Sequence, residues 1–364
     1  MALKCGITGV ANVGKSTLYN CMSNTKVETS SFAFTSSKSN LGIVDVPDPR
    51  LYNLENFQKT EKIIPATVEI VDIPGLTKGA NEGQGVGNQF LSDIRNTDAL
   101  IHVLRCFDDE NLPHIDGSVD PVRDIETLNL ELQVKDLESV EKKITRLEKL
   151  VKTGDKDAKK GIEVLNRYKS HLEEFQNAST LDVSDSDRQY INDLSLLTIK
   201  PVMYVCNVDD DAAIDGNTYV EAVKEYLKDE ETEILTLAGK LEAEISELDA
   251  EDRNEFLSDA GLTEPGVNKL IRSAYSMLNL MSFFTIGPKE IRAWTIKRGM
   301  TAPQAAGAIH SDLERGFIRA EVMKYEDFIS LGSEQACKDA GKLSVEGKNY
   351  VVDDADILHI RFNV

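Results

Sequence analysis

A phosphate-binding loop is encoded near the start of the chain. Residues 9–16 read GVANVGKS and match G-x-x-x-x-G-K-[ST], directly after an apolar run and before a helical segment. The glycines let successive backbone N–H groups turn toward phosphates, and the following helix adds positive potential. Lys15 is expected to bridge the β- and γ-phosphates, and Ser16 to offer a hydroxyl to Mg²⁺. The pattern predicts a nucleoside triphosphate site formed by Asn12, Val13, Gly14, Lys15, Ser16 and Thr17.

A second motif, D-x-x-G, follows a later apolar run. Asp72 ends that run, and a carboxylate there can hold Mg²⁺, usually through water, while the N–H of Gly75 reaches the γ-phosphate. Four glycines lie within residues 79–87, so this stretch is expected to be the mobile second switch. The alternative is a plain flexible loop.

Residues 207–210 (NVDD) stand where a G domain places the base-reading motif N-K-x-D. Asn207 follows an apolar strand, and Val208 replaces the lysine that normally packs over the base. Asp210 occupies the fourth position, where an aspartate grips the two neighbouring N–H donors of guanine. Base contacts are therefore expected from this motif or from the backbone after the next strand, namely from Asn207, Val208, Asp210, Leu237, Ala238 and Gly239. A polar turn without a ligand is the alternative.

The group that activates water is not obvious from the sequence. Small GTPases often place a glutamine directly after D-x-x-G, but Leu76 stands there and cannot orient water. Asn12 is a candidate catalytic residue beside Lys15 and Gly75, because an asparagine at this position helps some P-loop GTPases bind K⁺. The alternative is that Asn12 only shapes the loop. His114, in a loop before Gly117, is a weaker candidate to approach the nucleotide.

These residues need a sheet to position them. Six short runs rich in Val and Ile, separated by helical patterns, predict an α/β domain with a mostly parallel sheet. They cover residues 3–8, 43–46, 68–72, 99–104, 202–206 and 233–237.

The long gap between the fourth and fifth runs has a helical pattern. Leu130, Leu137, Ile144 and Val151 recur every seven residues, with Val140 and Leu147 on the alternate seam. A polar stretch with Gly154 and a second helical pattern follow, so an exposed antiparallel coiled coil is expected; two ordinary core helices are the alternative. The predicted domains are a G domain at residues 1–122 and 199–281, the coiled-coil insertion at 123–198 and a small α+β domain at 282–364.

Charge and composition narrow the class of protein. The net charge is −21, and residues 207–265 carry 19 Asp/Glu against four Lys/Arg, whereas residues 279–364 are nearly balanced at 12 against 11. The whole chain therefore cannot attract nucleic acid, although its C-terminal part can meet RNA locally. The five cysteines form no C-x-x-C pair, and neither a leader nor a membrane-length apolar run is recognised. A cytoplasmic protein without membrane or DNA partners is expected.

With these motifs in order, the chain resembles the YchF/Obg-like ATPase family of P-loop proteins. The most specific pieces are residues 46–50 (VPDPR), 117–121 (GSVDP), 262–266 (LTEPG) and the run from 283 to 364. That run is similar to a TGS domain, a small β-grasp module of RNA-linked proteins. The resemblance implies a G domain with an inserted coiled coil, and association with ribosomes, the large subunit in particular.

Two positions depart from the family pattern. The first switch usually reads F-C-T-x-E-P-N-x-G, and here either Thr35 or Ser36 is expected to complete the Mg²⁺ shell. The base motif usually ends in Glu, which accompanies a preference for ATP, whereas this chain has Asp210. We expect ATP to be the preferred nucleotide, with GTP also bound, and Mg²⁺ as cofactor with K⁺ as a second candidate.

Three functions fit these motifs. The first is a regulatory ATP/GTP hydrolase whose nucleotide state controls ribosome binding. The second is a P-loop kinase, which usually needs a lid with arginines that residues 78–93 lack. The third is an RNA-binding adaptor with weak activity, which the intact Lys15, Ser16 and Asp72 disfavour. In the first, the coiled coil and the C-terminal domain form an RNA-facing surface that includes Lys289, Arg292, Lys297, Arg298, Arg315 and Arg319.

Overall fold

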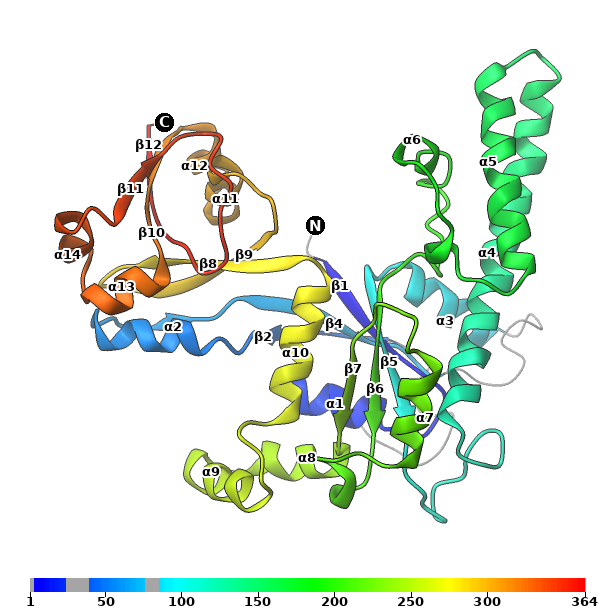
Figure 1. Ribbon diagram of the computed structural model, residues 1–364, viewed down its shortest axis with the longest axis horizontal. Coiled ribbons are helices and arrows are strands. Elements are labelled where there is room, and N and C mark those ends of the chain that lie inside the picture. Colours follow the sequence, from blue (N-terminus) through cyan, green and yellow to red (C-terminus); the bar gives the residue numbers. More distant parts are fainter. Residues whose placement is uncertain (1–2, 24–38, 76–84, 364) are drawn as a thin grey trace. The chain divides into compact units, whose positions relative to one another are not determined.

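The computed structural model describes residues 3–23, 39–75 and 85–363, which fall into two compact units (Figure 1). The first unit comprises Met1–Gly42 and Glu69–Val267, and the second comprises Ile43–Val68 and Asn268–Val364. Thr35, Ser36, Leu76 and most of the predicted second switch lie outside the described residues. The predicted boundaries near residues 122, 198 and 281 stay predictions.

The sheet that carries the nucleotide motifs has the strand order β2-β4-β1-β5-β6-β7. The registers from β4 through to β7 are all parallel, as predicted. Every residue of β5 is buried, which explains its continuous apolar sequence, because a central parallel strand is covered on both faces. Each of the six strands overlaps one of the six predicted runs, and the ends differ by at most three residues, at the start of β2. The strands are β1 (Lys4–Thr8), β2 (Asn40–Asp45), β4 (Thr67–Asp72), β5 (Ala99–Arg105), β6 (Val202–Asn207) and β7 (Ile234–Leu237).

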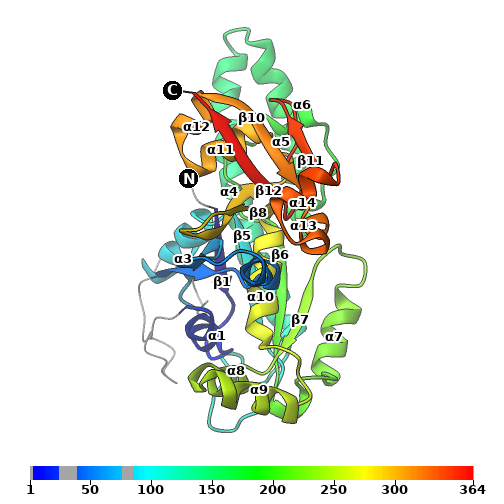
Figure 2. The ribbon, with the colours of Figure 1, turned by 90° about the vertical axis from the view of Figure 1, so that its left-hand side faces the viewer.

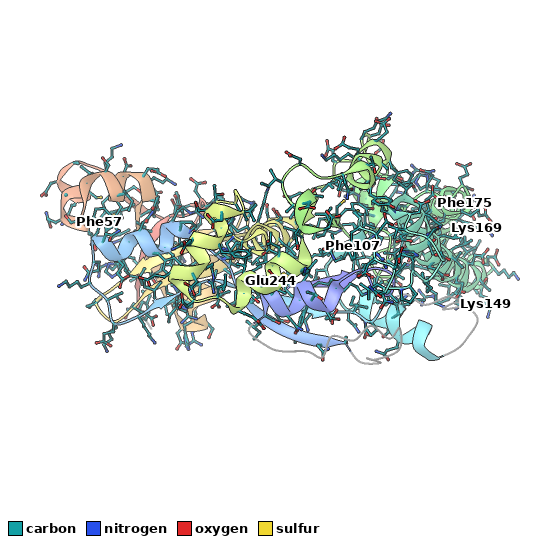
Figure 3. All side chains as sticks on the ribbon, turned by 90° about the horizontal axis from the view of Figure 1, so that it is seen from below. Phe57, Phe107, Lys149, Lys169, Phe175 and Glu244 are labelled. Carbon is teal, nitrogen blue, oxygen red and sulfur yellow. The ribbon has the colours of Figure 1, made fainter. Side chains whose placement is uncertain are left out.

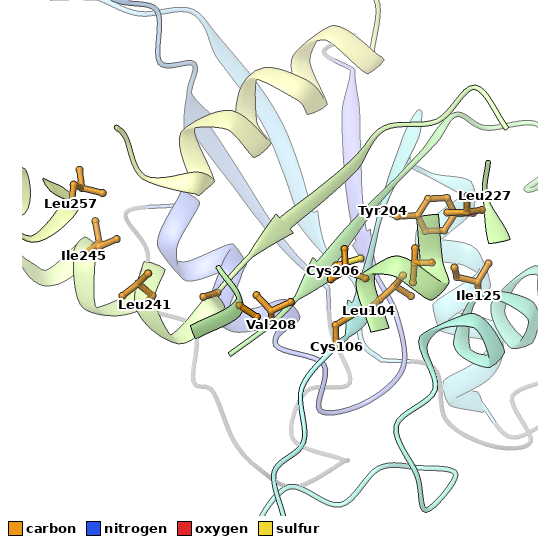
Figure 4. Close-up of a cluster of buried hydrophobic side chains, with 14 residues drawn as sticks. Leu104, Cys106, Ile125, Tyr204, Cys206, Val208, Leu227, Leu241, Ile245 and Leu257 are labelled. Atoms are coloured by element: carbon orange, nitrogen blue, oxygen red, sulfur yellow. The ribbon is translucent and has the colours of Figure 1, made fainter. Parts of the chain in front are cut away.

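Helices pack on this sheet through apolar clusters. Phe90 and Ile94 of α3 (Gly85–Arg95) contact the cluster around Val71 and Leu100. A second cluster joins β5 and β6 to α7 (Thr218–Tyr226), α8 (Gly239–Glu247) and α9 (Ala250–Asp259) (Figure 4). The first helix, α1 (Lys15–Met22), contacts α8. The phosphate loop and the loop after β7 therefore lead into two helices that touch.

The long gap is an antiparallel helical arm, as predicted (Figure 1). Its helices are α4 (Pro121–Val151) and α5 (Lys156–Glu173), joined by a turn in which Gly154 adopts a φ of 92°. Val140 packs in the core of the arm, with Leu137, Ile144 and Leu147 partly buried beside it. Leu130 was predicted to lie in the apolar seam of the coiled coil. This prediction was wrong, because Leu130 is 44% exposed.

The reason for this error lies at the base of α4, where the helix packs against the sheet and not against α5. Ile125 belongs to the cluster around β6, and Leu128 and Leu132 belong to the cluster around α3. The buried face therefore changes its partner along the helix. A heptad pattern describes packing against α5 only, so it does not predict which residues are buried at the base of α4.

A buried carboxylate fixes the return from the arm to the sheet. Asp136 accepts hydrogen bonds from the backbone N–H of Leu197 (2.7 Å) and of Thr198 (2.8 Å), and from the Thr198 hydroxyl (2.7 Å). Burial raises the pKa of Asp136, while these hydrogen bonds oppose the shift. Two short elements lie between α5 and this clamp, η2 (Ala178–Thr180) and α6 (Asp185–Arg188).

The second unit holds a mixed sheet with the order β11-β10-β12-β8-β9-β3 (Figure 2). Its core joins Phe283, Ile296 and Leu358 to the alanines of α11, in the manner of a small α+β fold. The strands are β3 (Ile63–Ile64), β8 (Leu280–Ile286), β9 (Ile291–Lys297), β10 (Phe317–Met323), β11 (Leu343–Glu346) and β12 (Ile357–Phe362). The helices are α2 (Pro49–Asn53), η1 (Leu54–Asn56), α10 (Gly266–Met277), α11 (Ala302–Ile309), α12 (Ser311–Arg315), α13 (Tyr325–Leu331) and α14 (Glu334–Asp339).

Residues 43–68 join this second unit although they lie early in the chain. Ile63 and Ile64 of β3 pair in parallel with Ile291 and Arg292 of β9. Arg50 forms an ion pair with Asp354 at 2.9 Å, and with its neighbour Asp48 at 2.8 Å. The VPDPR motif thus serves as structural support for the C-terminal fold.

Within residues 3–23, 39–75 and 85–363, no helix is both long enough and apolar enough to cross a membrane.

Candidate nucleotide site

The backbone of the phosphate loop is shaped by three left-handed residues. Gly9 has a φ of 145°, Asn12 a φ of 63° and Gly14 a φ of 95°. A Cβ atom on Gly9 would lie only 2.5 Å from the carbonyl oxygen of Val103, so a larger residue would displace the loop from β5. Helix α1 then begins at Lys15 with no side-chain cap at Gly14. Its first N–H groups are therefore left for an external anion.

Lys15 is held inside this loop. Its ammonium donates a hydrogen bond to the carbonyl oxygen of Val10 at 2.6 Å. Burial lowers the pKa of Lys15 to about 8, and the neighbouring Asp72 carboxylate partly offsets this shift. A Cβ atom on Gly75 would lie 2.9 Å from the Lys15 ammonium, so glycine lets the D-x-x-G segment approach the cation.

Ser16 and Asp72 form the pair expected for Mg²⁺. The Ser16 hydroxyl donates to Oδ2 of Asp72 at 2.9 Å. The other carboxylate oxygen, Oδ1, is buried and has no hydrogen-bond partner among the described residues. Burial raises the pKa of Asp72, while the Ser16 hydrogen bond and the Lys15 charge lower it. An orphaned anionic oxygen beside a hydroxyl fits a hard cation with oxygen ligands, so these residues fit Mg²⁺.

Asn207 connects the phosphate loop to the loop after β7. Its amide nitrogen donates to the carbonyl oxygen of Val13 at 2.8 Å, and its amide oxygen accepts from the N–H of Gly239 at 2.8 Å. The backbone N–H of Val208 also donates to the carbonyl oxygen of Leu237. The structure therefore brings residues 13, 207 and 237–239 together, as the predicted site requires.

Val208 and Asp210 point in different directions. The Val208 side chain is buried in the apolar cluster shown in Figure 4, so it does not take the place of the missing lysine over a base. Asp210 begins a short 3₁₀ helix, η3 (Asp210–Ala212), and its carboxylate lies 3.6 Å from the ammonium of Lys240. The sequence reasoning missed Lys240, although its position directly after Gly239 could have indicated it.

Asn12 faces a loop that follows β5. Its amide nitrogen donates to the carbonyl oxygen of Pro113 at 3.1 Å. That loop is held by the buried guanidinium of Arg105, which donates to the carbonyl oxygens of Phe107, Asp109 and Leu112. Arg105 was also missed, because an arginine at the end of an apolar strand gives no local sign of the carbonyls it will meet.

Both ring nitrogens of His114 have hydrogen-bond partners. Nδ1 accepts from the backbone N–H of Asp116 at 3.2 Å, so the proton of a neutral ring is on Nε2, which lies 3.1 Å from Asp124 Oδ2. Both side chains are buried. His102 is buried in β5, where burial lowers its pKa to about 3, in agreement with a structural role.

Comparisons with known proteins agree with this geometry. A family model described as "50S ribosome-binding GTPase" matches residues 4–167, and the YchF-GTPase_C model, described as a protein of unknown function, matches residues 280–363. The "Ribosome-binding ATPase YchF" of Escherichia coli O157:H7 is 47% identical over 364 residues, covering all of both chains. The chain belongs to the YchF family. A relative of the same description from Bacillus subtilis is 46% identical, again over the full length of both chains.

A solved structure supports the same assignment. The Schizosaccharomyces pombe YchF GTPase matches with a TM-score of 0.86 and 34% identity, covering 99% of this chain and 97% of the other. The family resemblance and the predicted fold class, a P-loop domain with a helical insertion and a C-terminal module, are therefore confirmed.

The lowered pKa of Lys15 predicts that triphosphate binding weakens in alkaline solution. Below about pH 8 the free protein carries the Lys15 charge, and above it the lysine must take up a proton to meet the phosphates. The Kd for a non-hydrolysable ATP analogue should therefore rise about tenfold for each pH unit above that value. Calorimetric titration with Mg²⁺ across this range measures the effect.

Lys15→Arg is the matched control, because arginine keeps its charge throughout this range. Whatever its absolute affinity, its Kd should not change with pH. An equally steep rise in the Arg variant, or a flat wild type, would assign the effect to another group.

Proposed function

We propose that the chain hydrolyses ATP in the loop of residues 9–16, and that its nucleotide state governs its association with ribosomes. The observation that carries this proposal is the assembled trio of Lys15, Ser16 and Asp72, in which one buried carboxylate oxygen has no hydrogen-bond partner among the described residues. The relatives named "Ribosome-binding ATPase YchF" match over the whole chain, which supports both the reaction and the partner. A ribosome partner would place the chain in the cytoplasm.

The residues have separate tasks in this proposal. The N–H groups at the start of α1 hold the phosphates, and Lys15 leaves the Val10 carbonyl to bridge the β- and γ-phosphates. Ser16 and Asp72 would hold Mg²⁺, which would supply further charge neutralisation, with Thr35 or Ser36 as the remaining candidate ligand. The N–H of Gly75, close to Lys15, contacts the γ-phosphate. Thr17, in the first turn of α1, contacts the phosphates next to Ser16.

Phosphate release without an added acceptor tests this function against a kinase. The purified protein should release inorganic phosphate from ATP, and Lys15→Ala should reduce the rate by about 10²-fold or more, since a buried cation at the transferred phosphate is removed. A malachite green assay measures the rate, and circular dichroism checks that the variant is folded. Turnover that survives in folded Lys15→Ala would contradict the proposed site.

Asn12 is the candidate for a K⁺ requirement. Its amide nitrogen is used by Pro113, and its oxygen is the atom that a monovalent cation beside the phosphates would take. Hydrolysis should then be several-fold faster in KCl than in NaCl of equal ionic strength, and Asn12→Ala should lose the difference. The same rate assay measures both. Equal wild-type rates in the two salts would leave Asn12 with a role in loop shape only.

The choice of base depends on Asp210 and on the cation beside it. Guanine must compete with the Lys240 ammonium for this carboxylate. The ion pair is weak, because the Lys240 side chain is 77% exposed and that of Asp210 is 41% exposed. Lys240→Ala should raise GTP affinity relative to ATP by up to about fivefold, the equivalent of about 1 kcal/mol. Asp210→Glu should shift the preference toward ATP, as in the family pattern. Fluorescent-nucleotide competition measures the ratio.

Lys224→Ala is a suitable control for Lys240→Ala. It removes the same charge from a lysine that pairs with Glu221 at 2.9 Å on α7. This variant should not change the ATP/GTP ratio. If neither Lys240→Ala nor Asp210→Glu changes it, the base is read by backbone groups at Leu237, Ala238 and Gly239.

The C-terminal unit offers a second part of the ribosome-facing surface. Arg315 and Arg319 pair with Asp312 and Glu321, whereas Lys289, Lys297 and Arg298 have no ion-pair partner within 4 Å in the described part of the chain. The Arg292 guanidinium lies 3.9 Å from the centre of the Trp294 ring. The unpaired cations and the stacked pair remain the residues for an RNA contact in this unit.

A further inference from the structure

The far end of the α4–α5 arm is strongly basic. The arm tip, defined as residues 142–160, carries eight Lys/Arg against three Asp/Glu, a net charge of +5 in a chain of net charge −21. Seven of these eight cationic residues are exposed. They are Lys142, Arg146, Lys149, Lys152, Lys156, Lys159 and Lys160.

Some of these charges are neutralised inside the protein. Lys143 and Arg146 pair with Asp193, Lys160 pairs with Asp187 at 3.0 Å, and Lys142 lies 3.5 Å from Glu138. The other four lysines have no ion-pair partner within 4 Å among the described residues. These tip lysines are Lys149, Lys152, Lys156 and Lys159. Lys149, which is labelled in Figure 3, lies in the last turn of α4.

Helix stability does not explain two of the tip lysines. Lys149 and Lys152 lie at the C-terminal end of α4, where a cation is favourable. Lys156 and Lys159, however, lie in the first turn of α5, where the helix dipole disfavours positive charge by about 0.3–1 kcal/mol each. Local helix stability therefore does not account for these two charges.

The arm presents these lysines on a fixed support. Val140, Leu165 and Tyr168 form its buried core, and the Tyr190 hydroxyl donates to Asp157 at 2.6 Å, just behind the tip. The Asp136 clamp holds the base of the arm. Little backbone order must therefore be gained on binding, which lowers the entropic cost of a contact.

We propose that the arm tip binds the phosphate backbone of an RNA helix. Lysine ammonium groups match phosphates as point charges, and residues 142–160 contain no aromatic side chain that could stack on bases. An acidic protein fits less well, because protein interfaces need an apolar centre and Leu150 is the one large apolar side chain exposed in this segment. The inference rests on the proposed ribosome association and specifies its chemistry as sequence-independent backbone contact.

Salt dependence of binding measures these contacts directly. Full-length protein is titrated with an RNA duplex of about 20 base pairs between about 50 and about 200 mM KCl, because each phosphate contact adds about 0.9 to the slope of log K against log salt. Replacing all four tip lysines by Gln should reduce the slope by about 3 to 4 and weaken binding more than tenfold at the lowest salt. Phosphate release without RNA should not change.

A pair of double variants separates position from net charge. Lys156→Gln with Lys159→Gln should reduce the slope by about 2. Lys224→Gln with Lys228→Gln removes the same charge from lysines that pair with Glu221 and Glu225, and should not change the slope. Thermal unfolding of each variant verifies the fold.

Three results would overturn the proposal. The slope could stay the same in the folded quadruple variant, the control double variant could reduce it equally, or poly-glutamate could compete as well as RNA at equal charge, which would indicate an acidic protein partner. If the protein hydrolyses ATP but the quadruple variant has the same slope as the wild type, the arm contact is refuted and the proposed function is not. If the wild-type protein does not hydrolyse ATP but its slope falls as expected in the quadruple variant, the proposed function is refuted and the RNA contact is not.

Discussion

The nucleotide site depends on one buried amide. Asn207 ends β6, and its side chain bonds at once to the Val13 carbonyl of the phosphate loop and to the Gly239 N–H that begins α8. Two loops that are distant in the chain are thereby fixed at the same edge of the sheet. Because the parallel strands β1, β4 and β6 all end at this edge, the residues proposed to bind phosphate, metal and base share one frame. Removal of the amide would leave a buried donor and a buried acceptor without partners, which costs about 1–3 kcal/mol for each group.

Around this frame, the protein holds polar groups that are incompletely satisfied. Lys15 is buried against a single carbonyl oxygen, and Asp72 Oδ1 has no hydrogen-bond partner among the described residues. Burial pushes the pKa of Lys15 down and that of Asp72 up, which means that both charged forms are less stable here than in water. A phosphate chain and a divalent cation would supply the missing partners. The charged forms of both side chains would therefore be stabilised by these ligands.

Acidic and basic side chains are concentrated in different parts of the chain. The stretch of residues 207–265 is strongly acidic, whereas the arm tip is basic and stands on a rigid helical pair. A polyanion approaching this chain is repelled by most of it and attracted at a few points, which favours one orientation of docking. Helix α4 begins shortly after the loop that contacts Asn12, and it ends at the arm tip.

Much of the site could be predicted from the sequence alone. The phosphate loop, Asp72 with Gly75, the six strands and the helical arm depend on local spacing and periodicity, and the structure has the strands and the arm where the patterns put them. The structure agrees with these sequence patterns because a P-loop needs glycines at fixed offsets, and a buried parallel strand needs a continuous apolar run.

Other features were decided only by the tertiary structure. The bond between Asn207 and Val13 spans 194 residues, and the pairing of Asp210 with Lys240 depends on how two loops meet. Leu130 fits the heptad but is exposed, because α4 changes its packing partner from the sheet to α5 along its length. Residues 43–68 join the C-terminal unit through β3, which no local pattern indicates. Local periodicity fixes which face of an element is apolar, whereas the partner of that face is chosen by packing between segments far apart in the chain.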